Sequence, residues 1–319
     1  YESESVVSRN YEAKNFSLFG NIDYFLSENY KLAFGLRWEN WDSKYNDSNQ
    51  ESFNPSDNMN GGKISLIKNN DNSNIYFSIA RGYKQGGFNL GLDATDNSIK
   101  DSLIYEPEFL TNYEMGLSSN SNNPILNYSA VFFFSEREDQ HVLISRQVDP
   151  TDPNTFSYLT QNAAEGENYG LEISSNYLVR DNLDLYANFG LLKTKIKNWE
   201  SRSDLKNRAQ AHAPERNFSL GANLSFMNNF YLKMDINGKS SFFYADSHNN
   251  KSKSYQLVNI TLGYKKSNLS TDIWIRNLFD EYYSTRGFFF GNEAPNFVDT
   301  LYKRQGDPKN IGISVRYDF

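Results

Sequence analysis

The stretch FSLGANLSFMNNFYLKMDI, residues 218–236, decides the fold class of this chain. From Phe218 to Phe226 every second residue is apolar, and after two asparagines the alternation resumes and continues to Ile236. Successive side chains of an extended strand point to opposite faces, so each half is a β-strand with one apolar and one polar face. The stretch therefore predicts two amphipathic strands joined by a tight turn.

Alternation of the same kind covers most of the chain, and the 3.6-residue spacing of a helix is sustained nowhere. The class is therefore all-β, with about thirteen strands. The predicted strands are 11–26, 30–45, 61–70, 74–88, 105–119, 125–147, 156–178, 183–199, 214–227, 230–246, 252–266, 268–286 and 308–319.

The connections between these strands alternate strictly between short and long. Tight turns such as 70–73 and 228–229 are followed by long polar loops such as 200–213 and 287–307. Outer-membrane β-barrels have short periplasmic turns and long extracellular loops, which is this arrangement. A soluble β-sandwich is the alternative, but its strands are typically about 5–6 residues long. The alternating runs here reach the roughly 9–11 residues that a tilted strand needs to cross a bilayer.

Composition excludes several other classes. The 319 residues include 22 Tyr and 24 Phe but no Cys, and the formal net charge is −7. The longest wholly apolar run, 130–134, is far shorter than the roughly 18 residues of a membrane-spanning helix. The absence of cysteine excludes disulfides and thiol metal sites. The acidic balance, without a basic stripe, argues against a nucleic-acid partner.

The final residues form one more amphipathic strand. Its apolar face carries Ile311, Ile313, Val315, Tyr317 and Phe319. A last strand that ends in an aromatic residue resembles the signal that the outer-membrane barrel-assembly machinery recognises. The alternative is an ordinary edge strand, although an exposed apolar edge would favour aggregation in a soluble protein.

Four further sets of local sequence, in order along the chain, resemble TonB-dependent outer-membrane receptors, and with the last strand the resemblance covers essentially the whole chain. They are ARGYKQGGFN at 80–89, EPE at 106–108 with NYEMGL at 112–117, NAA at 162–164 followed by YGLE at 169–172, and NLFD at 277–280 with YY at 282–283. We expect these motifs to be architectural.

The resemblance also shows what is missing. A complete receptor of this family has an N-terminal TonB box, a plug domain and a barrel of twenty-two strands. Residues 1–319 are therefore expected to be a single, N-terminally truncated barrel domain without the plug. An odd number of antiparallel strands would leave the first and last strands parallel, whereas bacterial barrels close with an even number.

The charged residues of the polar faces are candidates for contact with the plug, or for a solvated lumen. They are Arg37, Glu114, Glu172, Lys233, Asp235, Arg276 and Arg316. Aromatic and basic residues of the late loops are candidates for a ligand site at the extracellular mouth, or for packing between loops. They are Tyr244, Arg286, Phe288, Phe289, Phe290, Tyr302 and Arg304.

No catalytic set of residues is recognisable. His141, His212 and His248 are isolated from one another in the sequence, so neither a metal cluster nor a His-based triad is predicted. The acidic loop 149–154 has oxygens suited to Ca²⁺, but its Pro and Asp content favours a simple turn. We expect no enzyme activity and no cofactor.

The resemblance implies energised uptake across the outer membrane of a Gram-negative bacterium. The expected partners are outer-membrane lipid, the plug of the same full-length chain, the TonB complex, the barrel-assembly machinery and a small ligand, with a ferric siderophore or similar iron complex favoured. Cobalamin, haem or a carbohydrate are other ligands of such receptors. A passive diffusion pore is the main alternative function, and an outer-membrane enzyme is disfavoured by the scattered carboxylates and histidines.

The last strand leads to a prediction about assembly. Replacing Tyr317 and Phe319 with Ser, or deleting Phe319, should impair outer-membrane insertion of the full-length receptor, because the aromatic end of the apolar face is lost. Cell fractionation would measure the inserted amount. An unchanged outer-membrane yield for both variants would contradict the assembly signal.

Overall fold

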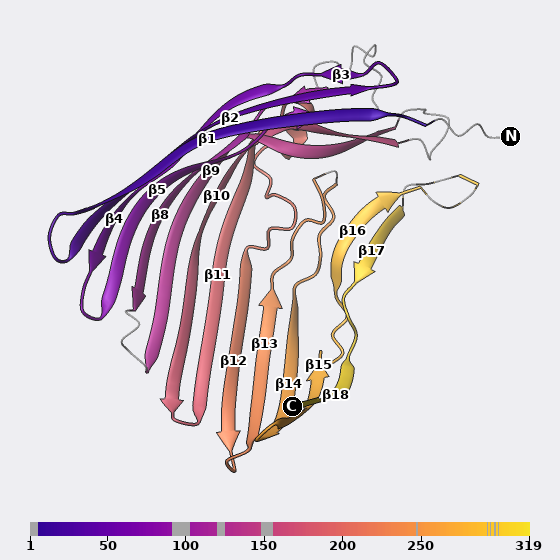
Figure 1. Ribbon diagram of the computed structural model, residues 1–319. Helices are drawn as coiled ribbons and strands as arrows, with labels where there is room; N and C mark the ends of the chain where they lie inside the picture. The colour runs from indigo at the N-terminus through magenta and orange to yellow at the C-terminus, as the bar shows by residue number, and fades with distance from the viewer. Residues whose placement is uncertain are drawn as a thin grey trace.

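The computed structural model describes residues 6–90, 103–119, 125–147, 156–246, 248–291, 293, 295–296, 298 and 300–319. Thirteen long strands follow one another in chain order in a single curved antiparallel sheet, with the short strand β3 (Ser52–Phe53) attached to β2 (Figure 1). The thirteen are β1 (Arg9–Phe25), β2 (Tyr30–Asp47), β4 (Ser56–Asn69), β5 (Ser73–Lys84), β8 (Glu108–Ser119), β9 (Leu126–Gln147), β10 (Phe156–Arg180), β11 (Leu183–Asn198), β12 (Arg216–Phe226), β13 (Phe230–Lys239), β14 (Tyr255–Lys266), β15 (Leu269–Arg276) and β18 (Asn310–Tyr317).

The sheet is open in the described part of the chain, with β1 and β18 as its edges. Thirteen alternating strands make these two edges run in the same direction, as the predicted odd count requires. No helix among the described residues is long and apolar enough to cross a membrane.

The stretch that decided the fold class forms the hairpin β12–β13. Leu220 pairs with Ile236 on one face, and Gly221 pairs with Asp235 on the other. Continuing this register across the sheet gathers the apolar positions of all strands on one face and most polar positions on the opposite face. The apolar face includes exposed side chains from every part of the sheet, among them Leu36, Leu66, Phe77, Met115, Phe132, Ile173, Phe189, Leu220, Met234, Leu262, Ile273 and Ile313. In a barrel wall this face meets lipid, and the polar face lines the lumen.

Three predicted strands are divided in the structure, and the first of them, 74–88, forms β5 and the separate short strand β6 (Gly87–Phe88). The predicted strand 268–286 ends at Arg276, because Asn277 and Asp280 have positive φ angles of 49° and 54° and turn the chain. The predicted strand 105–119 splits at Pro107, which has no N–H to donate to the ladder. Its first part is β7 (Ile104–Tyr105), which pairs with β6 (Gly87–Phe88) instead of joining the main sheet.

Two predicted loops contain ordered elements. The predicted loop 287–307 holds most of a separate hairpin, β16 (Ser284–Phe290) with β17 (Thr300–Gln305), which rises above β15 and β18 in Figure 1. The loop after β11 contains the short 3-10 helix η2 (Glu200–Leu205). The short turns, by contrast, lie where the sequence predicts them wherever the structure describes them.

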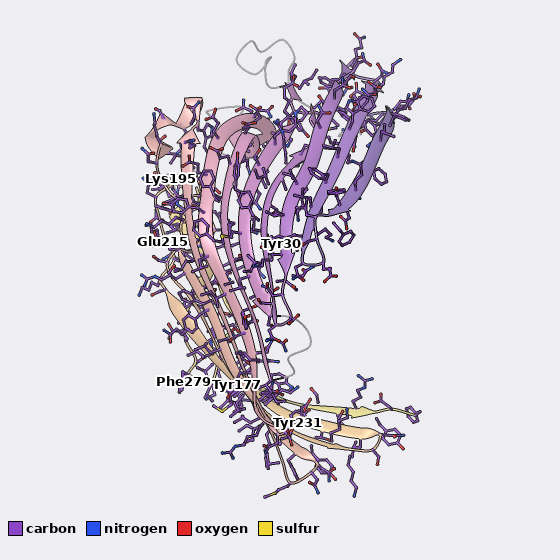
Figure 2. All side chains as sticks on the ribbon, turned by 90° about the vertical axis from the view of Figure 1, so that its left-hand side faces the viewer. Tyr30, Tyr177, Lys195, Glu215, Tyr231 and Phe279 are labelled. Atoms are coloured by element: carbon purple, nitrogen blue, oxygen red, sulfur yellow. The ribbon has the colours of Figure 1, made fainter. Side chains whose placement is uncertain are left out.

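Buried apolar side chains gather at the long-loop ends of the strands and not in the middle of the sheet. Trp41, Tyr45 and Met59 are buried near the long-loop end of β2 and β4, and Ile196 packs with Leu205 near that end of β11. Tyr177 and Tyr231 mark the opposite, short-turn end, while Lys195 lies toward the long loops (Figure 2). Loop packing at one end and a bare apolar band below it agree with strands that cross a bilayer.

Aromatic rings cover glycines across the main sheet. In each case the ring belongs to the preceding strand, lies directly opposite the glycine and fills the space that a Cβ would occupy. Within the described residues these pairs are Tyr76–Gly116, Phe133–Gly170, Tyr186–Gly221, Phe218–Gly238, Tyr231–Gly263 and Trp274–Gly312. The Tyr231 hydroxyl also donates a hydrogen bond to Asp272. A ring that covers a glycine and reaches a carboxylate on the next strand ties three strands together.

Adding a methyl group at such a glycine should destabilise the sheet. In Gly263→Ala the new Cβ would collide with the Tyr231 ring, displacing it and its hydrogen bond to Asp272. We expect a loss of roughly 1–3 kcal/mol of unfolding free energy, as for other overpacked sites. Urea unfolding of the folded barrel would measure it.

Gly82→Ala is the matched control, because a Cβ there meets open space in β5, a strand paired on both sides. Its effect should stay within about 0.5 kcal/mol. Equal losses for the two variants would show that the ring at Gly263 is not the cause.

Candidate functional site

Three predicted lumenal charges are already paired within the wall. Arg37 forms an ion pair with Glu39 and donates through Nε to the Tyr83 hydroxyl at 2.9 Å, and that hydroxyl donates to Glu39 at 2.8 Å. Glu39 is 7% exposed. This cluster joins β2 to β5. Glu39 and Tyr83 were not predicted as site residues. Alternation shows on which face of a strand a residue lies, but not which residue a charge will pair with.

Glu114 and Asp235 are likewise hydrogen-bonded across strands. Glu114 accepts from the Tyr76 hydroxyl. Asp235 accepts from the side-chain amides of Asn237 and Asn259, at 2.6 and 2.7 Å. These carboxylates hold neighbouring strands in register.

The remaining lumenal candidates keep their charged groups more open. Glu172 lies opposite Gly190 on the polar face, and Arg276 lies opposite Asn310. Within the described residues neither side chain forms an ion pair. Lys233 lies over the Tyr231 ring at 5.0 Å, and Arg316 pairs with Asp318 at the exposed end of β18.

The hairpin β16–β17 brings four of the predicted mouth residues onto one face. Arg286 lies directly opposite Arg304, and Phe288 lies opposite Tyr302 with stacked rings 6.0 Å apart. Phe288 is 55% exposed. The Tyr302 hydroxyl hydrogen-bonds to Glu293 at 3.2 Å, and neither arginine forms an ion pair within the described residues.

The other face of this hairpin packs against the loop between β13 and β14. Gly287 lies against the ring of Tyr244, which is 3% exposed. Phe289 makes an edge contact with the His248 ring, 4.9 Å between centroids. Tyr244 and Phe289 therefore pack loops together, while the side chain of Phe290 lies outside the described part of the structure.

Arg208 joins two long loops, 206–215 and 240–254, which with the hairpin form what we call the loop junction. Its guanidinium donates to Asp246 at 2.7 Å and to the carbonyl oxygens of His248 and Ala245 at 3.0 and 3.1 Å. It also lies 4.5 Å from the centroid of the Phe243 ring. This buried arginine was not predicted, because nothing local in a polar loop marks a residue that will meet a loop forty positions away.

Two histidines of the loop junction are held neutral. Burial, and secondarily the charge of Arg286, lower the pKa of His212, against the opposing effect of Asp246. Burial and the Arg208 charge lower the pKa of His248, against a hydrogen bond with the Gly287 backbone. Both rings are therefore uncharged at neutral pH, with His248 half-buried and His212 still exposed on one side.

A metal centre receives no support from the part of the chain that the structure describes, where no group of three His, Cys, Asp or Glu side chains converges. The acidic loop 149–154, the predicted turn with oxygens suited to Ca²⁺, lies outside the described residues.

Long antiparallel strands with an apolar outer face and a hydrogen-bonded polar inner face define the wall of an outer-membrane β-barrel. The chain matches the sequence family described as TonB dependent receptor-like, beta-barrel, over residues 2–278. It belongs to this family, whose members lie in the outer membrane of Gram-negative bacteria.

Three solved structures are similar to this chain. The ferric yersiniabactin uptake receptor FyuA from Yersinia pestis has a TM-score of 0.78 at 17% identity, covering 98% of this chain and 47% of its own. The siderophore receptor PiuA from Acinetobacter baumannii has a TM-score of 0.74 at 17% identity, covering 97% and 44%. The copper transporter OprC has a TM-score of 0.73 at 15% identity, covering 96% and 50%.

This chain thus spans about half the length of these proteins. The family resemblance, the antiparallel barrel fold and the outer-membrane location predicted from the sequence are confirmed. The similar proteins are receptors and transporters and not enzymes, as expected.

The neutral histidines predict that acid loosens the loop junction. The pKa of each histidine is lowered when the loops are packed together and is near 6.5 when the loops separate. Packing of the loop junction is therefore most stable above about pH 6.5 and becomes weaker as the pH falls below it. Hydrogen exchange of segments 206–215 and 240–254 should therefore be faster at pH 5.5 than at pH 7.5, after correction for intrinsic exchange. In His212→Gln/His248→Gln the difference should disappear. The same pH response in that variant would rule out the histidines as its source.

Proposed function

We propose that residues 1–319 form one barrel domain of a receptor for TonB-energised uptake, and that its ligand is an anionic iron complex such as a ferric siderophore. Membership of the TonB-dependent receptor family supports the transport class. In this proposal the wall holds the plug of the same full-length chain, and the TonB complex acts on that plug to release the ligand inward.

The exposed face of the β16–β17 hairpin is the observation that carries the ligand class. Arg286 and Arg304 lie directly opposite each other, where like charges repel and destabilise the hairpin. Retaining two opposed guanidinium groups without a described acidic partner is best explained by an anion that binds between them. The neighbouring Phe288 and Tyr302 offer ring faces to flat or aromatic parts of the same ligand.

The similar structures agree with this class. FyuA is a ferric yersiniabactin uptake receptor and PiuA is a siderophore receptor, whereas OprC is a copper transporter. The same wall therefore serves more than one metal, so the choice of an iron complex rests on the hairpin face together with the two siderophore receptors.

Among the lumenal charges, we assign plug contact to those that the wall leaves open. Glu172 and Arg276 have no ion-pair partner in the described residues, so they remain available to groups entering the lumen. Arg37, Glu114 and Asp235 instead serve the wall itself.

The ligand site is tested in cells that lack other iron-uptake receptors and express the full-length receptor. In Arg286→Ala/Arg304→Ala, uptake of radiolabelled ferric siderophores should require roughly tenfold more ligand per arginine removed, as expected for lost hydrogen bonds to charged groups. A panel of ferric siderophores, haem and cobalamin, each with and without an active TonB complex, would identify the ligand and the energy source.

Lys303→Ala is the matched control. Lys303 lies opposite Gly287, on the hairpin face that packs against the loops, so its loss removes a positive charge from the same strand but not from the ligand face. Uptake by this variant should match the unmodified receptor. Equal losses for the lysine and arginine variants would reduce the site to general surface charge, and TonB-independent uptake would favour a passive pore.

A further inference from the structure

The lipid-facing wall carries two positive charges at the upper boundary of its apolar band. Arg216, the first residue of β12, pairs with Leu191, the last apolar residue on this face of β11. Lys193 is the next residue outward on the same face of β11. Both side chains are exposed, and in the described part of the chain neither forms an ion pair.

Two other outward-facing cations nearby are already paired within the protein. Lys197 pairs with Glu167 at 2.7 Å and with Glu136 at 3.7 Å. Arg81 pairs with Glu138 at 3.8 Å and lies over the Phe109 ring. Lys193 and Arg216 have no such partner within the described residues, and neither has Lys195, the next residue outward on this face of β11.

Apolar grooves extend from these charges along the outer face. One groove of about 330 Å³ is lined by Phe132, Leu171 and Leu191, with Lys193, Arg216 and Glu215 at its mouth. A second, of about 320 Å³, continues toward the short-turn end between Ala187, Phe189 and Leu220. From Arg216 to Leu220 the path along β12 is roughly 13 Å.

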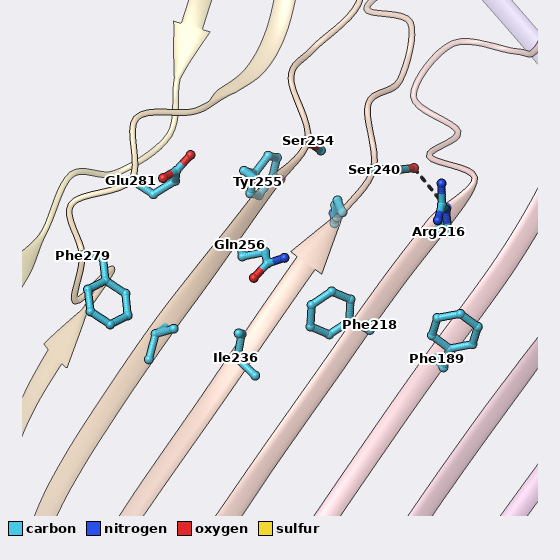
Figure 3. Close-up of a pocket in the computed structure, with 12 residues that line it drawn as sticks. Phe189, Arg216, Phe218, Ile236, Ser240, Ser254, Tyr255, Gln256, Phe279 and Glu281 are labelled. Carbon is cyan, nitrogen blue, oxygen red and sulfur yellow. Dashed lines mark hydrogen bonds between the residues drawn. The ribbon is translucent and has the colours of Figure 1, made fainter.

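A third groove of about 850 Å³ opens on the other side of Arg216, across the rings of Phe189 and Phe218 (Figure 3). The backbone N–H of Arg216 donates to the Ser240 hydroxyl at 3.0 Å, which anchors this residue to the end of β13 (Figure 3). Arg216 thus stands at a fixed place between apolar grooves. Glu215 reduces the local positive charge, but Lys193 and Arg216 together still exceed it.

We propose that Lys193 and Arg216 bind the phosphate of a glycolipid in the outer leaflet, whose acyl chains fill the grooves along β11 and β12. A phosphate group complements two unpaired cations, and an acyl chain complements the exposed apolar groove directly below them. The long-loop end of the strands faces the cell exterior, so the headgroup belongs to the outer leaflet. This lipid is bound at a specific site, in contrast to the lipids of the surrounding membrane.

The test uses the full-length receptor, purified in detergent and titrated with bis-phosphorylated lipid A by native mass spectrometry. Each basic side chain near an anionic headgroup contributes a factor of about five in affinity, so Lys193→Gln/Arg216→Gln should bind roughly 25-fold more weakly. The two single variants should show intermediate losses. Heat-modifiable migration on gels would verify that each variant is folded.

Lys197→Gln is the matched control, since this lysine lies on the same strand and face but is already paired with glutamates. It should bind the lipid like the unmodified receptor. Dephosphorylated lipid A should bind equally weakly to all variants, and millimolar inorganic phosphate should not displace the lipid.

Three results would overturn the proposal. The first is unchanged lipid A affinity in folded Lys193→Gln/Arg216→Gln, and the second is an equal loss with the dephosphorylated lipid. The third is full displacement by inorganic phosphate, which would indicate a site for a free anion.

Discussion

The backbone hydrogen bond in a medium without water is the constraint on which the rest of this structure depends. An N–H or C=O left unpaired in hydrocarbon costs several kcal/mol, so each membrane-crossing strand must bond to both neighbours. The strands from β2 to β15 meet this requirement by pairing in chain order with long antiparallel ladders. Side chains are then free to divide between an apolar outer face and a polar inner one. The outer face thus has many exposed apolar side chains because it contacts lipid and not water.

The same constraint explains why so much of the fold could be predicted. A strand held between lipid and a wet lumen must alternate along its whole crossing, so Leu220 and Gly221 already report opposite environments in the sequence. The break at Asn277 could not be predicted in this way, because 268–286 continues to offer acceptable strand residues. There the turn depends on the backbone conformation of Asn277 and on its side-chain bonds to the backbone of Glu281 and Asp307.

The candidate sites were predicted less completely, for a physical reason that differs between the two ends of the strands. On the lumenal face, alternation assigned Arg37 and Asp235 to the polar side of their strands but could not show that Glu39 and Asn259 pair with them. Loop residues do not alternate between lipid and lumen, so their sequence has no periodic pattern to interpret. Arg208 and Asp246 meet because β11–β12 and β13–β14 are adjacent hairpins, which is a fact of topology. The hairpin β16–β17 divides its residues between a packed and an open face, so the predicted mouth residues split into two roles.

The rings that cover glycines have a consequence for how the strands find their partners. Alternation of apolar and polar faces disfavours a strand pairing that is shifted by one residue, because every side chain would then lie in the wrong environment. It does not detect an error of two residues, which restores both faces. Such a slip would move the Tyr231 ring from Gly263 onto Thr261 or Lys265, whose side chains leave no room for it, and would take its hydroxyl away from Asp272. In the six described pairs the ring sits on the strand before its glycine, so that strand presents a template against which the next can be aligned. A few aromatic–glycine pairs thus specify the register between neighbouring strands, which the alternation of apolar and polar residues alone cannot specify.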